Sequence, residues 1–156
     1  MRSVRAVITG FVVVGAVAAM LATGEGTQSE AAGPAPEQDA FGASLSTDQA
    51  IYRSGEPIRI TFEVFNHTPA PVRFDFPSRQ RYDLLVEDPE GEESWRWSAD
   101  RMFAMVLGQE TLGPDKPRLV YEADCSARLE PGTYEIKGFL TAVNRAVSAT
   151  ITVEVR

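Results

Sequence analysis

Alternation of apolar and polar residues with a period of two is the feature that most constrains the fold of this chain. In residues 58–64, Ile, Ile, Phe and Val alternate with Arg, Thr and Glu. The same period recurs at 72–76, 82–86, 134–140 and 147–155. A strand with one buried face has this pattern, because successive side chains point to opposite faces of a sheet. These stretches therefore predict strands that cover a core on one side.

Three further strands are predicted at 41–47, 95–97 and 119–125, where the alternation is shorter or weaker. Turn sequences such as Pro89-Glu90-Gly91 separate the predicted strands at short, regular intervals. The chain shows no strand–helix–strand rhythm and no internal repeat. About eight short strands of this kind predict an all-β domain over residues 41–156, an immunoglobulin-like antiparallel β-sandwich.

One short helix is expected among these strands, at 98–107. Its apolar residues follow the i, i+1, i+4, i+5 spacing of one buried side, with Ser98 or Asp100 as the cap and Gly108 as the stop. We interpret this segment and the hairpin before it as a hydrophobic plug. Asp83 is expected to fix a turn or to pair with Arg96 or Arg101. The expected structural core motif consists of Tyr82, Asp83, Trp95, Trp97, Met102 and Phe103.

The N-terminal 22 residues predict export. Arg2 and Arg5 precede an uncharged apolar run at 6–22. The length of this run lies between a signal-peptide core and a membrane-spanning helix, so a cleaved signal peptide and an N-terminal membrane anchor both remain open. Either one places the domain outside the cytoplasm. Residues 23–40 contain no aromatic residue and carry four acids without a base, which predicts a disordered linker.

Composition excludes several classes of function. The formal net charge of −7 at pH 7 leaves no basic footprint for a nucleic acid. Cys125 is the single cysteine, so no internal disulfide is expected. His67 is the single histidine, which argues against a histidine-based metal site and against a Ser-His-Asp triad. We therefore expect no catalysis, no metal and no cofactor.

A series of short motifs, taken in order, resembles the BsuPI family, the intracellular proteinase inhibitor domain of bacteria. The motifs are Gly55-Glu56-Pro57-Ile58, Phe65-Asn66, Gln80-Arg81-Tyr82-Asp83, Trp95-Arg96-Trp97-Ser98 with Met102-Phe103, and Leu129-x-Pro131-Gly132-x-Tyr134. The resemblance spans 41–156. It implies an immunoglobulin-like sandwich and a non-enzymatic inhibitor of subtilisin-like serine proteases. Arg79 departs from the family pattern, which has a glycine there, and the export segment contrasts with the word intracellular.

An inhibitor of this kind needs an exposed, rigid segment that enters the protease cleft. Three loops qualify, at 66–71, 77–81 and 113–118. The middle loop is stiffened by Pro77 and supplies the protease-contact candidates Arg79, Gln80 and Arg81. In the alternative interpretation these arginines pair with Asp75, Asp83 or Glu87 on a solvated hairpin.

A second function remains open at this point. The domain could be a structural or adhesive module of the cell envelope, or a glycan-binding module that stacks sugars on an exposed indole of Trp95 or Trp97. In the preferred interpretation the partner is a protein, for which the resemblance suggests a serine protease, and the domain is a monomer. A membrane tether through residues 6–22 accompanies the anchor alternative.

Overall fold

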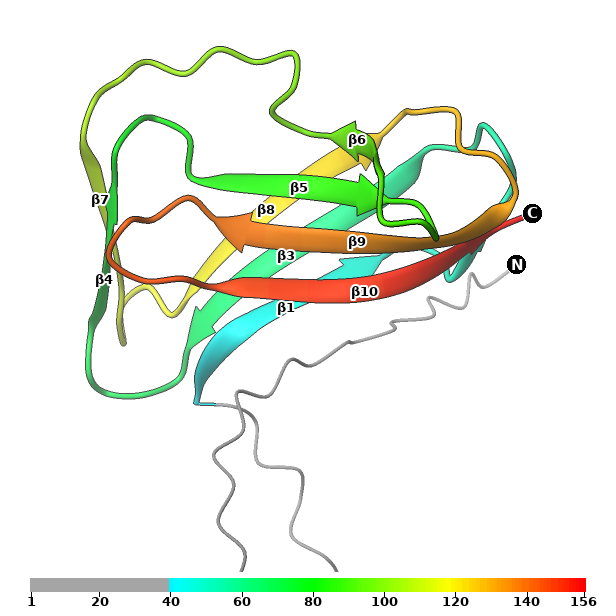
Figure 1. The fold of residues 1–156 in the computed structure, drawn as a ribbon. Coiled ribbons are helices and arrows are strands. Elements are labelled where there is room, and N and C mark those ends of the chain that lie inside the picture. The colour runs from blue at the N-terminus through cyan, green and yellow to red at the C-terminus, as the bar shows by residue number, and fades with distance from the viewer. Residues whose placement is uncertain (1–39) are drawn as a thin grey trace, which may run out of the picture.

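The computed structural model describes residues 40–156, and this part of the chain consists of ten β-strands and connecting loops, without a helix (Figure 1). The strands are β1 (Phe41–Thr47), β2 (Ile51–Tyr52), β3 (Ile58–Asn66), β4 (Val72–Phe76), β5 (Tyr82–Glu87), β6 (Glu93–Arg96), β7 (Gly108–Leu112), β8 (Arg118–Cys125), β9 (Gly132–Leu140) and β10 (Ser148–Val155). The expected signal peptide or anchor at 1–22, and the linker at 23–40 except for its last residue, lie outside the described residues.

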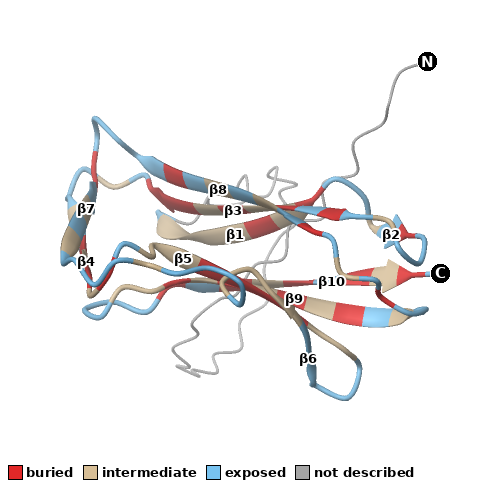
Figure 2. Ribbon diagram, turned by 90° about the horizontal axis from the view of Figure 1, so that it is seen from above, coloured by how far each residue is buried: buried red, intermediate tan, exposed pale blue. Residues whose placement is uncertain are grey.

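Two sheets face one another as the layers of a β-sandwich (Figure 2). One has the strand order β1-β3-β8, and the other has the order β2-β10-β9-β5-β6. The pair β4-β7 stands at one end of the two layers (Figures 1 and 2). All strand pairs are antiparallel except β2 with β10, where Ile51 lies opposite Glu154 in a short parallel ladder. No helix suited to crossing a membrane occurs in residues 40–156.

The core fills the space between the two layers. Phe62 of β3, Leu84 of β5 and Ile136 of β9 are all fully buried there. Gly138 of β9 lets the layers approach closely, because a Cβ atom at this position would lie 2.8 Å from Cδ2 of Phe62. β3 as far as Val64, and β9, bury the apolar residues of their period-two pattern, so the burial of one face is confirmed for them. β5 differs, because Asp83 and Leu85 on its other face are buried too.

Eight strands were expected, and each of them is present. Two more form where none was predicted. We expected a loop at 108–117, but β7 forms at its start and pairs with β4, placing Glu110 opposite Phe74. Only Leu112 of β7 is a buried apolar residue, so this strand has almost no alternation to recognise. β2 is only two residues long and is held by its pairing with β10.

The expected short helix at 98–107 is wrong. A turn occupies residues 97–100, and no regular structure follows until β7 begins. Figure 1 shows the reason: after β6 the chain runs along the length of β5 to reach β7 at the other end of the domain. An extended segment advances about 3.3 Å per residue, whereas an α-helix advances about 1.5 Å, so the extended form covers this span with fewer residues.

The assignment of Met102 to the core is also wrong, because its side chain is 100% exposed. The side chains of the two sheets already fill the space between the layers, and the segment after β6 runs outside it. Tyr82, Trp95 and Trp97, which were expected in the core, are partly buried and pack against it. Asp83 is buried, and Phe103 is half-buried against Trp97.

Candidate functional site

Residues 101–107, which we call the strap, form the most prominent apolar surface of the described chain. The exposed fractions are 100% for Met102, 82% for Met105, 51% for Val106 and 84% for Leu107. Apolar side chains scattered singly over a surface are ordinary, but a contiguous exposed group marks an interaction site. Four of the exposed large apolar side chains of residues 40–156 are concentrated in the strap, which makes this segment the candidate contact surface.

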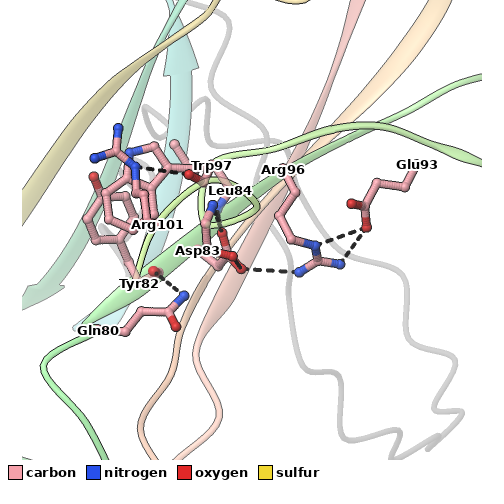
Figure 3. A network of polar contacts seen from close by, with 9 residues as sticks. Gln80, Tyr82, Asp83, Leu84, Glu93, Arg96, Trp97 and Arg101 are labelled. Carbon is pink, nitrogen blue, oxygen red and sulfur yellow. Dashed lines mark hydrogen bonds and ion pairs between the residues drawn. The ribbon is translucent and has the colours of Figure 1, made fainter. Parts of the chain in front are cut away.

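The N-terminal part of the strap is anchored on Trp97. The Arg101 side chain donates a hydrogen bond from Nε to the backbone carbonyl of Trp97 at 3.0 Å, and its guanidinium lies 4.3 Å from the centre of the indole (Figure 3). The Phe103 ring lies 5.6 Å from the indole, measured between ring centroids. A cation over an aromatic face and a tilted aromatic pair are both favourable arrangements. This end of the strap is therefore held against the domain.

A continuous row of aromatic rings links this anchor to the core. Trp97 packs on Tyr82 at 4.2 Å, Tyr82 on Tyr121 at 4.3 Å, and Tyr121 on Phe62 at 6.3 Å, all between ring centroids. The rings come from β5, β8 and β3 and from the turn after β6. Burial raises the pKa of Tyr82, and it raises the pKa of Tyr121 to about 12. The strap thus begins at a rigid point of the sandwich.

The buried carboxylate of Asp83 fixes the turn from which the strap starts (Figure 3). It accepts hydrogen bonds from the Ser98 hydroxyl at 2.6 Å, the Ser98 backbone N–H at 3.2 Å and the Leu84 backbone N–H at 3.0 Å. Nη1 of Arg96 is 3.1 Å away and completes the ion pair that was expected with Arg96 or Arg101. Arg96 also pairs with Glu93, and this hydrogen bond raises the pKa of Arg96.

The loop at 77–81 is the predicted contact segment. Two of its three candidate residues, Gln80 and Arg81, are held by contacts with the rest of the domain. Arg81 donates from Nη1 to the Ser78 carbonyl at 2.6 Å, and its guanidinium lies 4.7 Å from the centre of the Phe76 ring. Its acidic partner is Glu110 at 3.9 Å, and not Asp75, Asp83 or Glu87. The Gln80 carbonyl accepts a hydrogen bond from the Thr141 hydroxyl at 2.7 Å. These contacts hold the loop in place.

Arg79 is the exposed member of the three, and the structure brings it to the strap. Its backbone N–H donates to the Ala104 carbonyl at 2.9 Å. The backbone N–H of Val106 donates to the same carbonyl, also at 2.9 Å. Ala104 therefore fixes the middle of the strap, beside the arginine that the sequence had indicated.

A hollow of about 570 Å³ adjoins the C-terminal end of the strap. The residues that line it include Leu107, Gly108, Asp75 of β4 and the exposed Val143. The hollow extends the apolar surface of the strap towards the β4-β7 end of the domain.

The described residues give little support for a metal site, a reactive thiol or sugar stacking. Residues 40–156 contain no group of His, Cys, Asp and Glu arranged to hold a metal ion. Cys125 is a buried free thiol, and burial raises its pKa, so it has little thiolate character. Trp97 was a candidate for sugar stacking, but Tyr82, Phe103 and Arg101 pack around its ring.

The sandwich, with an anchored apolar segment on its surface, has the geometry of a protein-binding domain. The profile of the BsuPI family, described as intracellular proteinase inhibitor, matches residues 45–145. The chain belongs to this family, which confirms the resemblance in the sequence. The matched range includes the strap, the loop at 77–81 and the Asp83 network. No curated protein matches the chain.

Several solved structures are similar at low identity. The sporulation control protein Spo0M from Bacillus subtilis is 14% identical with a TM-score of 0.47, over 76% of this chain and 50% of that one. The CARDB domain of the PF1109 protein from Pyrococcus furiosus, in complex with di-metal ions, is 16% identical with a TM-score of 0.44, over 74% and 91%. The alkylpurine DNA glycosylase AlkC from Pseudomonas fluorescens, bound to DNA, is 15% identical with a TM-score of 0.45, over 75% and only 30%. We draw no functional conclusion from similarities at this level.

Proposed function

We propose that this domain inhibits a subtilisin-like serine protease by placing the strap in the substrate cleft of the enzyme. Membership of a proteinase inhibitor family supports a protease as the partner. The observation that carries the proposal is the exposure of Met102, Met105 and Leu107 on a segment that is anchored at Trp97 and at β7.

An anchored segment suits this role for two physical reasons. A few large side chains that fill pockets supply most of the binding energy of an interface. A segment already held in one conformation also loses less conformational entropy on binding than a flexible one. The Arg101 and Phe103 contacts with Trp97, and the hydrogen bond from Arg79 to Ala104, provide this restraint.

The domain acts in this proposal without catalysis and without a cofactor. Its strand order supports the immunoglobulin-like form of the sandwich. Immunoglobulin-type domains place their first, second, fourth and fifth strands in one sheet and their third, sixth and seventh in the other. Here β1, β3 and β8 form one sheet and β5, β9 and β10 are in the other, with β6 beside β5 as an added strand. The three strands of the β1-β3-β8 sheet correspond to the first, second and fifth, and the fourth has no counterpart in that sheet.

Export is part of the proposal as well. Arg2 and Arg5, followed by the apolar run at 6–22, support secretion or membrane anchoring. The target protease would then act outside the cytoplasm, in contrast to the word intracellular in the family description.

Titration of subtilisin with the purified protein tests this function. Val106 on the strap and Val120 on β8 have similar exposed fractions, 51% and 53%, and form a matched pair. We expect Val106→Asp to weaken inhibition at least about tenfold, because a charge replaces an apolar contact, and Val120→Asp to have no effect. No inhibition by the wild-type protein at micromolar concentration, or equal effects of the two substitutions, would contradict the proposal.

A further inference from the structure

Met105 occupies a distinctive position in the middle of the strap. The residues on either side of it, Ala104 and Val106, are joined by a hydrogen bond from the Val106 N–H to the Ala104 carbonyl at 2.9 Å. A bond between residues two apart closes a three-residue γ-turn, here with Met105 at its centre. The Met105 side chain is 82% exposed at this bend. The turn therefore presents Met105 outward while its neighbours are fixed.

The backbone of Met105 is also available. Within residues 40–156, neither its N–H nor its C=O is hydrogen-bonded to another residue. Unpaired main-chain groups of an exposed segment are free to form hydrogen bonds with a partner protein. The carbonyl of Ala104, in contrast, is already occupied by Arg79 and Val106. The main-chain groups of Met102 and Phe103 are likewise without a partner in residues 40–156, so the side chain and its neighbours, and not the free backbone alone, distinguish Met105.

The two other large side chains of the strap are less suited to entering a deep pocket. Met102 lies between Arg101 and Phe103, which both pack on Trp97, so the chain on either side of it is held against the domain. Leu107 immediately precedes β7 and lines the hollow beside Asp75. Of the three most exposed side chains, only Met105 has exposed neighbours on both sides, Ala104 and Val106. Val106 also lies between exposed residues, but its side chain is shorter and only 51% exposed.

We propose that Met105 enters the primary specificity pocket of the protease and that this pocket is apolar. The inference rests on the proposed function above, and adds the residue that determines specificity. Methionine is long, unbranched and apolar, so it fills an apolar pocket without a charged partner. A pocket built for Lys or Arg would contain an unpaired acid when Met105 occupied it, and such a buried charge is costly.

A change of specificity tests the inference. The purified full-length protein is prepared as wild type, as Met105→Lys and as the matched control Met102→Lys, and inhibition constants are measured for subtilisin and for trypsin. Both side chains are exposed, so both variants should fold, which circular dichroism verifies. We expect Met105→Lys to shift the ratio of the two constants towards trypsin by about 30-fold or more, the effect of a residue that dominates an interface. Met102→Lys should leave the ratio unchanged.

The outcomes separate the inference from the function on which it rests. Wild-type protein that inhibits neither protease overturns the proposed function and the inference together. Wild-type protein that inhibits subtilisin, with a ratio that Met105→Lys leaves unchanged, overturns the inference alone. An equal shift from Met102→Lys also overturns it, because a general charge effect would then explain the result.

Discussion

The backbone N–H of Arg79 donates a hydrogen bond to the carbonyl of Ala104 at 2.9 Å, and this bond joins the loop at 77–81 to the strap. The contact residue predicted from the sequence and the apolar segment found in the structure therefore belong to one surface. Arg81, two residues further on, instead bonds the Ser78 carbonyl and packs on Phe76. The two arginines thus have different roles.

Substitution of each arginine should reveal this difference. Arg81→Ala removes a hydrogen bond to a backbone carbonyl and a cation–π contact, so we expect it to lower the free energy of unfolding by about 1–2 kcal/mol. Arg79→Ala removes only an exposed side chain and should change it by less than about 0.5 kcal/mol. Urea unfolding followed by tryptophan fluorescence measures both values. Equal losses of stability would show that the loop is not held by Arg81.

Replacement of Gly138 by any larger residue should destabilise the fold. A Cβ atom there would lie 2.8 Å from Cδ2 of Phe62 and 3.1 Å from Cδ2 of Leu84, and both of these side chains are fully buried. Overpacking of this kind costs about 1–3 kcal/mol. We expect Gly138→Ala to lower the melting temperature clearly in differential scanning calorimetry.

Gly113→Ala is the control for this experiment, since its Cβ would meet Pro71 at 3.6 Å, an ordinary contact distance. It should leave the melting temperature nearly unchanged. If Gly138→Ala were as stable as Gly113→Ala, the close approach of β9 to Phe62 would be wrong.

The stability of the domain should fall at alkaline pH because of Tyr121. Burial raises its pKa from 10.0 to about 12 in the folded protein. The folded state therefore holds the phenolic proton more tightly than the unfolded state. This contribution is complete below pH 10.0 and is lost as the pH rises through about 12.

Tyr121→Phe should remove this part of the pH dependence and keep the aromatic stacking. Melting temperatures measured from neutral pH to about pH 12 should then fall less steeply for the variant than for the wild type. Tyr52, whose pKa burial also raises to about 12, continues to contribute in both proteins. Parallel curves for the two proteins would contradict the assignment to Tyr121.

The sequence predicts the strands well wherever one face of a strand is buried. β10, and β3 as far as Val64, alternate strictly because the sandwich covers only one side of each. β7 was not predicted because it pairs with β4 at the end of the sandwich and contains only one buried apolar residue, Leu112. β2 is too short for any pattern and depends on its pairing with β10, which is about a hundred residues away in the sequence.

The site is harder to predict because its contacts join distant parts of the chain. The apolar spacing of Met102, Phe103, Val106 and Leu107 is the same for a buried helical turn and for an exposed strap. Whether the segment is buried as a helix or exposed as a strap depends on how completely other side chains fill the space between the sheets. The local sequence carries no information on this. For Asp83 the sequence left a turn and a pair with Arg96 or Arg101 open, and the structure shows that it bonds Ser98 in the turn and pairs with Arg96.

Hydrogen–deuterium exchange on the protein alone and in complex with subtilisin tests the central claim most directly. We expect the amides of residues 104–107 to exchange more slowly in the complex, because the enzyme covers the strap. The loops at 66–71 and 113–118 should exchange at the same rates in both samples. Protection of either of those loops, with unchanged exchange in the strap, would contradict the account.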